Sequence, residues 1–114
     1  MKRDSDERLR DILDAADAIA RNLPGSHAAL ERDEVRQAAL LRWIGVIGEA
    51  ANHVSTDVHA AYPAVPWRSI VGMRNRTVHA YFEVDLDVLW KVASEELPRV
   101  RTQIEAILRE RPQH

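Results

Sequence analysis

The stretch AALLRWIGVIGEAA, residues Ala38 to Ala51, restricts most strongly how this chain can fold. Its apolar residues surround the helix axis instead of forming one stripe, and a helix of this kind must be buried on several sides. The stretch is shorter than the roughly 20 apolar residues of a membrane span. Gly45 and Gly48 lower its helix propensity, which is explained if another backbone approaches closely at these positions. We therefore expect a buried helix over about residues 31–54, packed against other helices and partly against a second subunit.

The sequence also indicates one helix before residue 31 and another that begins after the prolines of the following link. In residues 5–23 the apolar positions recur at intervals of three and four, the period of a single apolar stripe, and Pro24-Gly25 ends the segment. Prolines mark an irregular link over residues 56–66. The next helix is expected to begin near Trp67 and to weaken at the β-branched pair Thr77-Val78.

A last helix is expected to begin at Asp85 or Asp87, either of which is suited to a cap. Its apolar residues keep a helical period, but Pro98 lies inside the pattern and is expected to kink or divide the helix. No segment shows the alternation typical of strands. The sequence therefore predicts an all-α fold, an up-down four-helix bundle with a short or kinked additional C-terminal helix, as a single domain over residues 1–114.

Charge and composition limit the functions open to the chain. The net charge is −2, so the overall charge does not attract nucleic acid, and an anionic ligand must be bound by a local patch. No cysteine is present, which excludes disulfides and thiolate metal sites and fits a reducing compartment. The charged N-terminus lacks the apolar run of a signal peptide. We expect a cytoplasmic protein with no membrane segment.

The segment VGMRNRTVHAYFEVD, Val71 to Asp85, concentrates reactive side chains: Arg74, His79 and Tyr81. No acidic residue occurs between positions 58 and 82, although the chain has 18 of them. On a regular helix the arginine and the histidine would lie roughly 140° apart. They converge only if the arginine wraps around the helix, the helix breaks before the histidine, or a second copy supplies the partner.

An arginine and a histidine together have the chemistry to cleave RNA without a metal ion. The imidazole can deprotonate the 2′-hydroxyl or protonate the leaving 5′-oxygen, while the guanidinium stabilises the charge of the transition state. One such histidine per chain leaves the acid or the base role unfilled, and a symmetric dimer would supply the second. Arg68, Arg76 and His59 add local positive charge for an RNA backbone. An arginine and a histidine near a helix end more often make caps or surface ion pairs, so spacing alone leaves both interpretations open.

The longer string YPAVPWRSIVGMRNRTVHAYFEVD, Tyr62 to Asp85, resembles the signature of the HEPN superfamily. More narrowly, it resembles HepT, the toxin of the HepT/MNT toxin–antitoxin pairs, whose R-x4-H-x-Y motif matches at Arg74, His79 and Tyr81. The resemblance implies a HEPN helical bundle that acts as a homodimer and as a metal-independent endoribonuclease, with RNA as its substrate and no cofactor. Arg74 and His79 would be catalytic, with Asn75 in support.

The resemblance also implies a type VII toxin–antitoxin system with a minimal nucleotidyltransferase, MNT, as the antitoxin. The partner would attach AMP from ATP to Tyr81, and an anionic group two residues from His79 would repel an incoming phosphate backbone. An alternative from another class is a helical companion subunit that presents substrate to a nucleotidyltransferase without cleaving anything. A third interpretation is a plain dimeric bundle whose motif is coincidental.

Glu49 lies in the most apolar helix, where an unpaired carboxylate is costly. It is expected to be buried in a pair with an arginine, or to orient Arg74 or Arg68 at the site. His53 and Glu49 provide two potential metal ligands, but no third ligand stands at a convincing spacing, and no metal site is predicted. His59 is expected in a loop, exposed to solvent or in contact with RNA.

Overall fold

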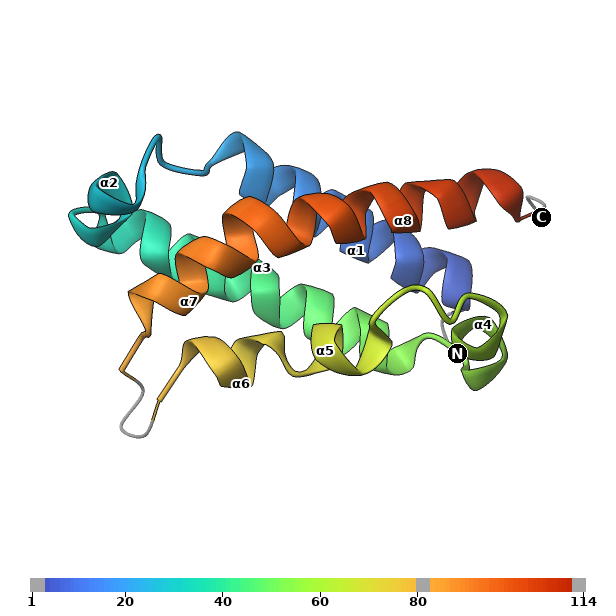
Figure 1. Cartoon of the computed structure of the whole chain (residues 1–114). Coiled ribbons are helices and arrows are strands. Elements are labelled where there is room, and N and C mark those ends of the chain that lie inside the picture. Colours follow the sequence, from blue (N-terminus) through green and yellow to red (C-terminus); the bar gives the residue numbers. More distant parts are fainter. Residues whose placement is uncertain (1–3, 80–82, 112–114) are drawn as a thin grey trace.

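The computed structural model describes residues 4–79 and 83–111, and within these ranges the chain is helical with no strand. Figure 1 shows helical rods that alternate in direction along the chain. The rods are, in order, α1 (Ser5–Arg21), α3 (Glu34–His53), α5 (Trp67–Val71) with α6 (Met73–Thr77), and α7 (Leu86–Lys91) continued through a π turn (Val92–Glu96) into α8 (Leu97–Glu110). The predicted all-α bundle is confirmed.

Two short helices depart from the sequence prediction. α2 (His27–Glu31) is separate from α3, because Asp33 caps α3 by accepting a hydrogen bond from the Arg36 amide at 3.0 Å. The helix predicted over about residues 31–54 is therefore confirmed with slightly shorter bounds, Glu34–His53. α4 (Thr56–Ala61) occupies part of the link that was predicted to be irregular, with Ser55 as its cap. Local side-chain caps decide these boundaries, and apolar periodicity does not reveal them.

The core lies where α1, α3 and α8 face one another, with the shorter helices closing its sides (Figure 1). Its large, fully buried side chains on these three helices are Leu9, Ile12, Ile19, Leu40, Ile44, Ile47, Leu97 and Ile104. Along each helix they lie three, four or seven residues apart, so they share one face, and burying them forms one apolar interior. The other face of α3 keeps partly exposed apolar residues, so its burial on several sides is only partial. No helix in the described ranges is long and apolar enough to cross a membrane.

The two glycines of α3 make different contacts. A Cβ atom at Gly48 would lie 3.2 Å from the carbonyl oxygen of Val71, so the backbone of α5 does approach α3 closely there, as predicted. A Cβ atom at Gly45 would meet the Cδ atom of Arg74 at 3.6 Å, an ordinary contact with a side chain. The expectation of a close backbone is wrong at this second position. Gly45 instead lies beneath the stem of Arg74.

The C-terminal rod is divided, as Pro98 predicts. Asp85 caps α7 with its Oδ1 atom, which accepts a hydrogen bond from the Val88 amide at 3.1 Å. The π turn then leads into α8, where Pro98 occupies the first turn. Proline has no amide hydrogen to donate and tolerates only this part of a helix, which explains why the regular hydrogen bonding changes just before it.

Candidate functional site: the edge formed by residues 67–85

The predicted motif lies where helix gives way to extended chain. α6 ends at Thr77, whose hydroxyl donates to the Arg74 carbonyl at 2.8 Å, and Val78 is already extended. The chain then folds back, since the His79 amide donates to the Glu83 carbonyl at 2.7 Å and the Asp85 amide to the Thr77 carbonyl at 2.8 Å. Of the three alternatives left open by the sequence, the helix does break before the histidine. Helical geometry no longer fixes the relation of Arg74 to His79.

His79 is held by a carboxylate. Its Nε2 atom lies 3.0 Å from Oδ2 of Asp85, and the imidazole remains 59% exposed while the carboxylate is 27% exposed. The other oxygen of Asp85 caps α7. The first turn of α7 therefore holds the carboxylate in place, and the carboxylate in turn orients the imidazole ring. The amide of Val88 and, after it, the pairing with His79 lower the pKa of Asp85 from its ordinary value of 3.8. Sequence reasoning assigned Asp85 only a capping role, because nothing in a spacing of six residues reveals this contact.

Arg74 presents its guanidinium without a protein partner. Within residues 4–79 and 83–111, no hydrogen bond or ion pair involves this side chain, which is exposed at the surface of α6. It lines a hollow of about 520 Å³ over α3 and a smaller one of about 180 Å³ that Asn75 also lines. No hydrogen bond joins Arg74 to His79 in the described part of a single chain. Tyr81 lies outside the described residues.

The two arginines predicted to touch RNA differ from each other. The guanidinium of Arg76 already has partners within the protein. It contacts Glu96 at 3.0 Å and the Ser69 hydroxyl at 3.2 Å. Arg68 is exposed, and its side chain has no ion pair or hydrogen bond in the described ranges. A contact with RNA at either residue remains a prediction, and Arg76 would first have to leave Glu96.

The expectations for Glu49 and His59 are wrong. The Glu49 side chain is 69% exposed and pairs with His53 at 2.9 Å, because it lies on the face of α3 that is turned away from the core. It neither lies in a buried pair with an arginine nor bonds to Arg74 or Arg68. His59 lies in α4, where it bonds to the Ala51 carbonyl at 3.0 Å and stacks on Trp67. No group of three or more potential metal ligands occurs among the described residues.

Comparison with known proteins gives the family. A family model described as ribonuclease HepT-like matches residues 12–107. A protein of Thermococcus cleftensis named probable ribonuclease HepT is 34% identical over 110 residues, which cover 94% of this chain and 98% of that protein. A protein of Methanocaldococcus jannaschii, named provisionally as an RNase, is 33% identical over 107 residues that cover 93% of this chain and 98% of the relative. No solved structure matches the chain significantly.

The fold and this edge together define a class of protein, namely helical bundles of four rods that carry an R-x4-H motif on one edge. The matched region, residues 12–107, includes most of α1 and α8, the two rods between them and the motif. The chain belongs to the HepT-like ribonuclease family, as the resemblance of its sequence implies. Family membership assigns it to the ribonucleases.

Proposed function

We propose that this protein is an endoribonuclease that uses the 2′-hydroxyl of its RNA substrate as the nucleophile and needs no metal ion. The imidazole of His79 takes the proton of the 2′-hydroxyl, the 2′-oxygen attacks phosphorus, and the bond to the 5′-oxygen breaks. Protonation of that oxygen leaves a 2′,3′-cyclic phosphate and a 5′-hydroxyl end. Arg74 stabilises the negative charge that builds on the phosphoryl oxygens during the attack.

The contact between His79 and Asp85 is the observation that carries this proposal. An ionised carboxylate only accepts hydrogen bonds, so Nε2 carries the proton of the neutral ring and Nδ1 keeps a lone pair. That is the form that a general base needs, and the exposure of the ring leaves it accessible to substrate. Asp85 thus acts as a positioning residue for His79. The guanidinium of Arg74, which has no partner among the described residues, supplies the second requirement, a planar donor group that is available to phosphate.

A homodimer completes the proposed site. One chain offers a single histidine in the motif, whereas cleavage needs a base for the 2′-hydroxyl and an acid for the 5′-oxygen. A two-fold axis beside the edge would bring the motif of a second copy to the same phosphodiester. Within one chain no hydrogen bond joins Arg74 to His79, which is consistent with a site shared between copies.

The proposal includes a type VII toxin role, which rests on the resemblance of the motif to that of HepT. An MNT antitoxin would transfer AMP from ATP to Tyr81, releasing pyrophosphate, and the added phosphate would block the edge and repel RNA. The toxin would then act in the cytoplasm only when the antitoxin is lost.

The test is expression in a bacterium that lacks the partner. Growth arrest should disappear in Arg74→Ala and in His79→Ala, but persist in Arg10→Ala, a change of equal charge at an exposed position of α1. The purified variants should remain folded dimers. Arrest that survives loss of both motif residues would favour the non-catalytic companion subunit.

The modification has its own test. After incubation with the partner and ATP, the intact mass of the protein should rise by whole AMP units, and Tyr81→Phe should abolish the rise. An unchanged mass with an active partner would contradict this part of the proposal.

A further inference from the structure

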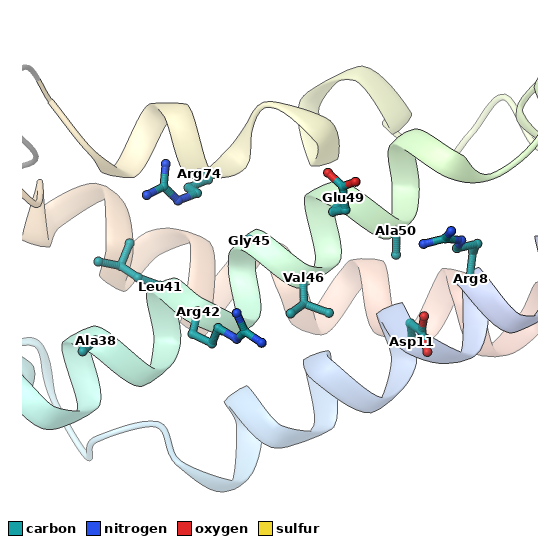
Figure 2. A pocket seen from close by; sticks show the side chains of 10 residues that line it. All are labelled: Arg8, Asp11, Ala38, Leu41, Arg42, Gly45, Val46, Glu49, Ala50 and Arg74. Carbon is teal, nitrogen blue, oxygen red and sulfur yellow. The ribbon is translucent and has the colours of Figure 1, made fainter. Parts of the chain in front are cut away.

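A hollow of the described structure lies along α3 and begins at Arg74. Its volume is about 520 Å³, within the range of sites that hold small organic ligands. Figure 2 shows the arginines that line it: Arg74 on one side of α3, Arg42 on α3 itself and Arg8 on the other side. We call this the arginine hollow.

The cations of the arginine hollow lack partners within the part of the chain that the structure describes. The guanidinium groups of Arg8, Arg42 and Arg74 form no hydrogen bond or ion pair with any described residue, and Nε of Arg8 is buried without an acceptor. A buried guanidinium nitrogen without a partner is costly, so the position is poorly explained by stability alone. Elsewhere in the bundle, arginines are paired with acids, as in Arg101 with Asp17.

The acids of the arginine hollow do not cancel this charge. Glu49 lines it, but its carboxylate is engaged with His53 at 2.9 Å. Asp11 also lines it, so two carboxylates face three guanidinium groups. The remaining wall is apolar or small and includes Leu41, Gly45 and Val46. Positive charge above an apolar floor suits a phosphate with its attached sugar or base.

We infer that the arginine hollow binds the RNA strand beside the scissile phosphate, with Arg8 and Arg42 holding phosphates of the neighbouring nucleotides. The inference rests on the proposed function, which places the scissile phosphate at Arg74. A strand held there continues into the hollow that Arg74 itself lines. Arg8 and Arg42 are substrate-binding residues, and they take no part in proton transfer.

Binding is measured with a fluorescent single-stranded DNA oligonucleotide, which offers the same phosphates but lacks the 2′-hydroxyl and is not cut. Each of Arg8→Ala and Arg42→Ala should weaken binding roughly tenfold. The slope of log affinity against log salt should fall in magnitude by about 0.7 for each lost contact on a single strand. Arg10→Ala is the matched control on α1 and should bind like wild type. Arg8→Lys and Arg42→Lys retain the charge and should recover part of the affinity.

Cleavage of the matching RNA then separates this inference from the proposed function. KM should rise in Arg8→Ala and Arg42→Ala while kcat is retained. If wild type and both variants bind the oligonucleotide equally, the inference fails, whether or not Arg74 and His79 are needed for cleavage. If wild type does not cut RNA but the variants still lose binding and salt dependence, the proposed function fails and the hollow remains a nucleic-acid site. Variants that become monomers and bind the strand normally would show that a second copy covers the hollow, which overturns the inference.

Discussion

The bundle of α1, α3 and α8 differs from the edge formed by residues 67–85 in how far its important side chains are buried. In the bundle the large apolar side chains are buried and some charges are paired across it, as in Arg101 with Asp17 and Arg111 with Asp6. At the edge the helices are five residues long, and Arg74 is exposed without a partner in the described ranges. Stability and reactivity therefore reside in different parts of the molecule. Mutations that separate the two parts test this division.

The largest effect on stability is expected in the bundle. Ile44 is completely buried, and Ile44→Ala should lower the free energy of unfolding by about 3 kcal/mol, because it removes apolar contacts and leaves a cavity. Cleavage per folded molecule should be unchanged. Urea denaturation and an RNA cleavage assay measure the two quantities. Val35→Ala, at a position that is 80% exposed, is the control and should change stability by less than about 0.5 kcal/mol.

The next effect is expected where the bundle supports the edge. Gly48→Ala places a Cβ atom 3.2 Å from the Val71 carbonyl, so α5 must shift, and Arg74 on the adjoining α6 shifts with it. We expect Gly48→Ala to be less stable than Gly45→Ala by about 1–3 kcal/mol and to cleave RNA more slowly. Gly45→Ala makes only a 3.6 Å contact and should gain helix propensity. Equal stability and activity of the two variants would mean that α3 does not position the edge.

A smaller effect on cleavage is expected when the carboxylate that holds His79 is removed. Asp85→Asn keeps the shape of the side chain and a residue suited to capping α7, but removes the charge that holds His79 at 3.0 Å. Cleavage should fall roughly tenfold while the midpoint of unfolding changes little. The pH–rate profile should also change, since a purely structural role would leave it unaltered. Unchanged cleavage and an unchanged profile would remove Asp85 from the site.

The same variant gives a prediction for stability against pH. The pKa of Asp85 is lowered by the Val88 amide and by His79 from an ordinary value of 3.8. A carboxyl group with a lowered pKa in the folded state stabilises that state above its unfolded pKa, and the contribution is lost as pH falls through the folded value. The small stability advantage of wild type over Asp85→Asn should therefore be present above the ordinary value of 3.8 and be lost as pH falls through the lowered folded value. An advantage that grows at low pH would contradict the assigned contacts.

The smallest effect is expected at Arg76. Its pair with Glu96 is partly exposed, with side chains 41% and 24% accessible, and such pairs contribute about 0–1 kcal/mol. A double-mutant cycle of Arg76→Ala with Glu96→Gln measures that coupling. RNA affinity should change less than in Arg42→Ala. A larger loss at Arg76 would show that this arginine leaves its structural pair to bind RNA.

The same division explains what could be predicted from the sequence. The helices of the bundle follow from apolar periodicity, and the division near Pro98 follows from its missing amide hydrogen. The break before His79 was one of three open alternatives, since β-branched residues weaken a helix without fixing where it ends. The contact with Asp85 and the exposure of Glu49 depend on how separate segments pack. Likewise, Arg8 and Arg42 lie on different helices, and no local pattern connects them.

The most direct test compares purified wild type, Arg74→Ala and His79→Ala on a single-stranded RNA and on DNA of the same sequence. Cleavage of RNA by wild type should leave 2′,3′-cyclic phosphate ends, the DNA should stay intact, and each variant should lose at least about 100-fold in rate while remaining folded. RNA cleavage that persists at the wild-type rate in either variant would contradict the assignment of these two residues.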